Sequence, residues 1–138
     1  MPKLHRSTAS LRFFGDQLDP DRLSAALGAE PTQSCRKGDV RIGKVTGKEW
    51  IEQAGKWLLH ANDASPANLD AQVADILGAL TEDLDVWRSL PSEYQLDLFC
   101  GFFMEGSDEY LSVSAPSLKQ LGDRGIRLGM CLYDGRDD

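Results

Sequence analysis

The sequence predicts one α+β domain with a largely antiparallel or mixed sheet, a long amphipathic helix packed on one face, and two short helices. A chain of 138 residues has the usual length of one domain and can bury about 70% of its unfolded surface. Several segments alternate apolar and polar residues, as strands do, and one segment repeats its apolar residues at helical spacing. We expect the domain to span residues 9–134, with flexible ends at 1–8 and 135–138.

The first elements are a short strand and a short helix. Leu11, Phe13 and Phe14 predict a short apolar strand that stops at Gly15. Asp19 is placed to cap the free N–H groups of a helix, and Pro20 suits its first position. Gly28 ends this helix, as glycine commonly does.

Residues 35–61 return to a period of two and predict two strands. Val40 and Ile42 belong to the first strand, and Trp57 and Leu59 belong to the second. Gly residues and the polar segment 46–49 mark the turn between them. We place Trp50 on or near this connecting loop.

The long helix is predicted after Ser65-Pro66 and before Pro91. Its apolar residues recur at steps of three and four, which gives a continuous stripe over about six turns. The stripe consists of Leu69, Val73, Ile76, Leu77, Leu80, Leu84 and Trp87.

The last third of the chain predicts three strands and a second short helix. Alternation over residues 94–104 indicates a long strand, apolar on one face and partly apolar on the other, and therefore central. A short strand is expected over 110–114. Ser114 then caps a brief helix through Leu121, and residues 126–133 form the last strand.

Composition excludes several classes of function. A net charge of −7 argues against sequence-independent binding to nucleic acid and against an anionic membrane surface. No segment approaches the roughly 20 apolar residues of a membrane span, and residues 1–10 lack the apolar run of a secretory signal. Cys35, Cys100 and Cys131 form no CxxC pair, so we expect free thiols in a reducing cytoplasm and no cofactor or metal.

No catalytic or metal-binding constellation stands out. The acidic residues at a helix start are interpreted as capping residues rather than a calcium loop: Asp16, Asp19 and Asp21. A calcium loop would need an oxygen ligand at the position of Leu23 and glycine at the position of Ser24. A Cys100–His60–Asp97 arrangement is disfavoured because Cys100 lies in an apolar pattern. Aromatic residues in apolar patterns are assigned to the core: Trp57, Trp87, Phe99, Phe102 and Phe103.

The residues also support a family resemblance over most of the chain. It is carried by the segment Leu11–Asp16, by Leu18-Asp19-Pro20, by Leu27–Thr32, by Leu98–Phe102 and by the closing Leu118–Leu132. The span from about Ser10 to Tyr133 resembles a bacterial family catalogued as domain of unknown function 4279. The resemblance implies a small soluble α+β protein with no established activity. Some domains of this general sort are similar to immunity or accessory proteins of bacterial toxin systems.

The charge distribution supports a leading functional hypothesis. Residues 65–93 carry six acidic residues against Arg88 alone. We expect a non-enzymatic protein-binding module, acting as an immunity or accessory protein, whose acidic surface meets a basic partner. The residues expected to bind that partner are Trp50, as a separate anchor, and Asp75, Glu82, Asp83 and Asp85. The sequence leaves the partner and the oligomeric state open.

A second hypothesis rests on the basic residues of segment 36–56. Arg36, Lys37 and Arg41 surround a turn at Gly38 and are candidates to hold an anion in a sheet-edge pocket. The protein would then be a small-molecule or anion-binding domain, with an enzyme of unrecognised type included in this class. The simpler interpretation is a charged edge strand that discourages aggregation.

Overall fold

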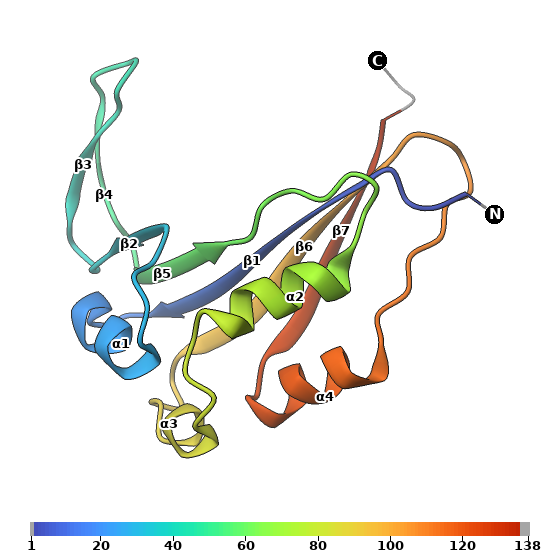
Figure 1. Ribbon diagram of the computed structural model, residues 1–138. Coiled ribbons are helices and arrows are strands. Elements are labelled where there is room, and N and C mark those ends of the chain that lie inside the picture. The colour runs from blue at the N-terminus through green and yellow to red at the C-terminus, as the bar shows by residue number, and fades with distance from the viewer. Residues whose placement is uncertain (1, 136–138) are drawn as a thin grey trace.

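A computed structural model describes residues 2–135 and contains a mixed five-stranded sheet with β1 (Arg6–Gly15) at its centre (Figure 1). The strand order is β2-β5-β1-β6-β7. The flanking strands are β2 (Gln33–Cys35), β5 (Gly55–His60), β6 (Gln95–Met104) and β7 (Arg127–Asp134). All pairings are antiparallel except that of β6 with β7, which is parallel. The predicted α+β class and mixed sheet are therefore confirmed.

Helices cover one face of this sheet and leave the other open (Figure 1). They are α1 (Pro20–Leu27), α2 (Leu69–Gly78), α3 (Leu84–Arg88) and α4 (Ala115–Asp123). Alternate residues of β1 are buried on the helical side: Ser7, Ala9, Leu11 and Phe13. We call the opposite side the open face; in β1 it carries Arg6, Thr8, Ser10, Arg12 and Phe14.

The core lies between the helices and the sheet and is organised around Phe13. Its ring packs edge-on against Trp57 at 5.6 Å and is stacked with Trp87 at 6.3 Å. The prediction that Phe99 and Phe103 also belong to this core was wrong. Both rings lie on the open face, where the guanidinium of Arg12 sits 4.4 Å from the Phe99 ring and that of Arg6 sits 3.8 Å from the Phe103 ring.

The predicted long helix is two short helices, which corrects the second part of the fold prediction. After α2 the chain makes a tighter turn, in which Leu80 N–H donates to the Leu77 carbonyl. Thr81 N–H then donates to the Leu27 carbonyl, at the end of α1, at 2.8 Å. Asp83 starts α3 by accepting a hydrogen bond from Asp85 N–H. The apolar stripe is continuous in sequence because both helices pack on the same core.

Segment 35–61 also differs from its prediction, because one further short strand lies between the two predicted ones. β3 (Val40–Ile42) and β4 (Glu49–Ile51) pair with each other as a separate two-stranded sheet. Trp50 therefore lies within a strand rather than on the connecting loop. The turn at Gly38, where φ is +92°, separates β2 from this hairpin.

The N-terminal residues are part of the fold rather than a flexible end. Leu4 is buried and donates its N–H to the Tyr110 carbonyl at 2.8 Å, and β1 begins at Arg6. Residues 110–114 form no strand beyond a single bridge between Lys3 and Tyr110. Gly135 N–H donates to the Met104 carbonyl. The expected flexible end at 136–138 lies outside the described residues.

A carboxylate joins α2 to the start of α4. Asp70 Oδ1 accepts from Ser114 N–H at 2.9 Å and from Ser117 Oγ at 2.8 Å. The hydrogen bond from the Ser114 backbone is the main cause that lowers the pKa of Asp70 below its ordinary value of 3.8. Because the folded pKa lies below the unfolded value, this stabilisation is present above the unfolded pKa and is lost as pH falls through the folded pKa.

We expect Asp70→Asn to lower the free energy of unfolding at neutral pH by about 1 kcal/mol, because the amide accepts these bonds without a charge. The difference between variant and wild type should shrink on acidification to about pH 3, as the wild-type carboxylate becomes protonated. Urea unfolding across this pH range measures both effects. Asp75→Asn, on an exposed residue of the same helix, is the matched control and should track the wild type. A constant difference at every pH would contradict the assignment.

Candidate functional site

The β3–β4 hairpin is the most exposed element of the structure. Its turn is closed by Gly43 N–H donating to the Lys48 carbonyl at 2.8 Å and by Gly47 N–H donating to the Gly43 carbonyl at 2.9 Å. Gly47 has a φ of +66°, a conformation that favours glycine. Figure 1 shows the hairpin rising from one end of the sheet, away from the four helices.

One face of the hairpin is apolar and exposed. Val40 pairs with Ile51, and Ile42 pairs with Glu49, so these side chains share one face. Val40, Ile42 and Ile51 are 60%, 63% and 58% exposed, respectively. A two-stranded hairpin is marginally stable alone in water, and grouped apolar side chains on a surface commonly mark an interaction site. We call Val40, Ile42 and Ile51 the hairpin patch.

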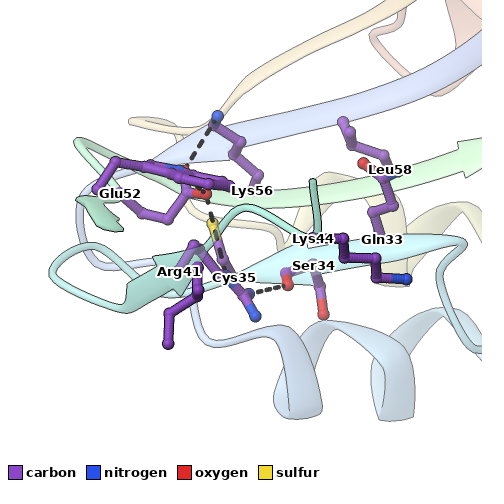
Figure 2. A pocket seen from close by; sticks show the side chains of 10 residues that line it. Gln33, Ser34, Cys35, Arg41, Lys44, Glu52, Lys56 and Leu58 are labelled. Carbon is purple, nitrogen blue, oxygen red and sulfur yellow. Dashed lines mark hydrogen bonds and ion pairs between the residues drawn. The ribbon is translucent and has the colours of Figure 1, made fainter. Parts of the chain in front are cut away.

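The other face of the hairpin closes a pocket against the edge of the main sheet (Figure 2). Arg41 and Trp50, which are paired across the hairpin, lie on this side. The cavity has a volume of about 530 Å³. Its lining includes Ile42 of the hairpin patch, so the two surfaces share this residue. The other lining residues are Gln33, Ser34, Cys35, Arg41, Lys44, Trp50, Glu52, Lys56 and Leu58.

Glu52 connects the two walls of the pocket, which are the β3–β4 hairpin and the edge of the main sheet formed by β2 and β5. Its side chain is only 12% exposed, accepts a hydrogen bond from Trp50 Nε1 at 3.1 Å, and pairs with Lys56 Nζ at 3.2 Å. The Trp50 hydrogen bond, followed by that of Lys56, lowers the pKa of Glu52. Arg41 spans the same gap, because its Nη2 donates to the Ser34 carbonyl at 2.7 Å while its Nε lies 3.9 Å from Glu52.

The pocket carries more positive than negative charge. Arg41, Lys44 and Lys56 line it, against the single carboxylate of Glu52. Lys44 makes no ion pair with any residue that the structure describes, whereas Arg41 and Lys56 both approach Glu52. The arrangement therefore suits a ligand with an anionic group near Lys44.

The cysteine in the pocket is a poor nucleophile. Cys35 is buried, and its thiol donates towards the Ala54 carbonyl at 3.5 Å. Burial, with a smaller contribution from the charge of Glu52, raises the pKa of Cys35. Nucleophilic cysteines need a lowered pKa and partial exposure, and this buried thiol with a raised pKa has neither.

The Cys100–His60–Asp97 arrangement is not formed. Cys100 is fully buried on the helical side of β6, and burial raises its pKa to about 12. Asp97 lies on the open face in a two-bond ion pair with Arg12. His60 is exposed, with its Nδ1 2.6 Å from Ser10 Oγ.

The basic residues predicted to act with Arg41 lie elsewhere. Arg36 Nη2 is 2.7 Å from Asp19 Oδ1, and Lys37 Nζ is 3.1 Å from Asp16 Oδ2. Both cations are therefore paired with carboxylates of the segment between β1 and α1. Asp19 also caps that helix by accepting from two backbone N–H groups, as its sequence position predicts.

The predicted acidic residues are exposed on the helical side of the molecule: Asp75, Glu82, Asp83 and Asp85. Asp83 also caps α3, and Asp85 forms a 3.6 Å ion pair with Arg88. Trp50 belongs to the hairpin, which rises from the sheet away from these helices (Figure 1). The structure thus separates the predicted anchor from the predicted acidic surface.

Sequence reasoning missed the pocket's second wall. Cys35 of β2 and Lys56 of β5 face each other across an antiparallel pairing, 21 positions apart in sequence. The signal present in the sequence was the alternation around Trp57, which places Lys56 and Leu58 on the face opposite the core.

Among the helices that the structure describes, none has the length and apolar character that a membrane crossing requires. Residues 2–135 contain no group of three or more His, Cys, Asp or Glu side chains able to hold a metal ion.

Comparison with known proteins gives a single result. No curated protein and no solved structure matches the chain. One family model, described as a domain of unknown function (DUF4279), matches residues 4–135. That match confirms the resemblance seen in the sequence, and the chain belongs to the DUF4279 family.

Proposed function

We propose that this protein is a non-catalytic module that binds another protein through the β3–β4 hairpin. The observation that carries the proposal is the hairpin patch, in which three apolar side chains, each more than half exposed, share one face of a projecting element. Burial of such side chains is the main favourable contribution to most protein association. Trp50, half exposed on the other face of the same hairpin, is the type of aromatic residue that often dominates binding energy.

Charge indicates the chemistry of the partner. The hairpin carries Arg41, Lys44 and Lys48 against Glu49. The surface that fits it is therefore an apolar patch bordered by carboxylates, since complementary charge selects partners and speeds their encounter. An immunity or accessory role would be one biological setting for such binding. The alternative is binding through the exposed acidic residues on the helical side, which would favour a basic partner instead.

The experiment compares two surfaces in one capture assay. Tagged wild type, the hairpin variant Val40→Asp/Ile51→Asp, whose two positions lie outside the pocket lining, and the acidic-surface variant Asp75→Lys/Glu82→Lys are incubated with lysate of the source organism. Captured proteins are quantified by mass spectrometry, and binding of the recovered partner is measured with purified proteins. Circular dichroism checks that each variant is folded.

We expect one protein to be captured stoichiometrically by the wild type and by the acidic-surface variant, and to be lost with the hairpin variant. Retention of that protein by the hairpin variant would overturn the proposal. If only the acidic-surface variant failed to capture that protein, the binding site would be assigned to the helical side and the partner would be basic.

The pocket supports a second candidate function, the binding of a small anionic molecule. Lys44 is the observation that favours it, because it is the one pocket cation without an ion pair among the described residues. A ligand that binds only the native state raises the melting temperature. We expect a phosphorylated or carboxylated metabolite to do so in the wild type and to lose this effect in Lys44→Ala. Lys48→Ala, outside the pocket lining, is the control; equal shifts in all three proteins would contradict a site at Lys44.

A further inference from the structure

A second cavity opens on the open face of the sheet, where β1 ends and where β6 and β7 begin. It has a volume of about 410 Å³ and shares no lining residue with the pocket that the hairpin closes. We call this cavity the arginine pocket. The lining residues that give it its chemistry are Arg12, Phe14, Tyr94, Gln95, Asp97 and Arg127.

Strand pairing places one carboxylate of this pocket between two guanidinium groups. Arg12 of β1 is opposite Asp97 of β6, and Asp97 is opposite Arg127 of β7, so the three side chains form one row on the open face. Arg12 Nε and Nη2 donate to the two oxygens of Asp97 at 2.8 and 2.7 Å. The Arg127 side chain makes no hydrogen bond or ion pair with any residue that the structure describes. One carboxylate therefore serves two cations, and the charge of Arg127 is left without a counter-ion.

Arg12 is held in one position and still has donors to offer. Its guanidinium lies 4.4 Å from the ring of Phe99 and 5.2 Å from that of Phe14, in addition to its two bonds to Asp97. The remaining nitrogen, Nη1, donates to none of the residues 2–135, and the side chain is 30% exposed. A guanidinium that is already fixed loses little conformational freedom when a ligand binds. The arginine pocket is therefore bordered by unpaired N–H donors of Arg12 and Arg127.

We propose that the arginine pocket binds a small α-hydroxy carboxylate. Two guanidinium groups against the carboxylate of Asp97 leave one positive charge, which matches a monoanion. A phosphate group with two negative charges would bring the second one close to Asp97, where it is repelled. Guanidinium groups bind carboxylates through two parallel hydrogen bonds, and the amide of Gln95 and the hydroxyl of Tyr94 offer partners for a ligand hydroxyl. The volume of the cavity lies in the range of small-molecule sites.

The test is a titration of the isotope-labelled full chain, followed through its backbone amide signals in NMR spectra. The probe is sodium lactate, an α-hydroxy carboxylate, and lactamide is its uncharged counterpart. We expect lactate to shift the amide signals of Gln95, Asp97, Gly125 and Arg127, which belong to the pocket lining. The dissociation constant should be in the millimolar range, because so small a ligand makes few contacts. Lactamide and sodium chloride at the same concentrations should leave these signals in place.

Substitutions of single arginines locate the site. Arg127→Gln removes a charge at an exposed position and should weaken lactate binding about tenfold, the scale of a lost charge-assisted hydrogen bond. Arg127→Lys keeps the charge without the two-bond geometry and should bind with intermediate affinity. Arg22→Gln is the matched control, because Arg22 is also exposed and has no ion pair among the described residues, but it lies on α1 outside the pocket. This control should bind lactate like the wild type.

Three results would overturn the proposal. The first is equal shifts with lactamide or sodium chloride, and the second is an Arg127→Gln variant that binds lactate as tightly as the wild type. The third is a set of lactate shifts confined to the pocket lined by Lys44. Tighter binding of inorganic phosphate at the same residues would overturn the assignment to monoanionic carboxylates. The arginine pocket and the hairpin patch have no residue in common, so failure of this proposal leaves the proposed function standing.

Discussion

Replacing Gln72 by Leu should lower the free energy of unfolding by about 2–4 kcal/mol, because buried polar groups would be left without partners. Gln72 is 2% exposed and reaches the first strand from α2. Its Oε1 accepts from Ser7 Oγ at 2.7 Å, and its Nε2 donates to the carbonyls of Ser7 and Asn62, each at 2.9 Å. Leucine fills a similar volume but offers none of these bonds.

Urea unfolding of the purified variant measures this loss, and a double-mutant cycle identifies its origin. Ser7→Ala removes the hydroxyl that donates to Gln72 and accepts from Asn68 N–H. The combined variant should lose less stability than the two single variants added together, because one interaction is removed only once. A Gln72→Leu loss below about 0.5 kcal/mol, the range of ordinary surface substitutions, would show that the network contributes little.

This network illustrates which part of the fold the sequence predicts. The spacing of Leu69, Val73 and Ile76 indicates a helix with one buried face, and α2 is that helix. The spacing cannot show where the helix stops, because the interruption depends on Thr81 bonding to the Leu27 carbonyl, 54 positions away. A periodic pattern records which residues face the core, and two helices on one core share a single pattern.

The same reasoning explains the misplaced aromatic residues. Period-two alternation shows that β6 is apolar on both faces, and it assigns Phe102 and Phe103 to opposite sides. It does not show which side the helices cover. Phe99 is packed on the open face by Arg12, which in turn pairs with Asp97, 85 positions away in sequence. That arrangement follows from the pairing of β1 with β6 and has no local signal.

The candidate site was predictable only in part. Trp50 and Arg41 were selected from the sequence, and both line the pocket. Arg36 and Lys37 are near Arg41 in sequence, but they pair with carboxylates of the segment that precedes α1. Proximity along the chain indicates local charge, whereas a binding site depends on strand pairing and on the turns between strands.

Trp57→Ala should be the most damaging single substitution in the core, with an expected loss of about 3–5 kcal/mol in the free energy of unfolding. Trp57 is fully buried, packs on Phe13, and donates its Nε1 hydrogen to Ser24 Oγ at 2.9 Å. The truncation therefore leaves a cavity against Phe13 and also removes the hydrogen bond that joins β5 to α1. Denaturant unfolding followed by circular dichroism measures the loss without relying on tryptophan fluorescence. Trp50→Ala, which truncates a half-exposed ring, is the matched control and should lose about 1 kcal/mol or less. Similar losses for the two variants would mean that the hairpin, rather than the layer between helices and sheet, carries a large share of the stability.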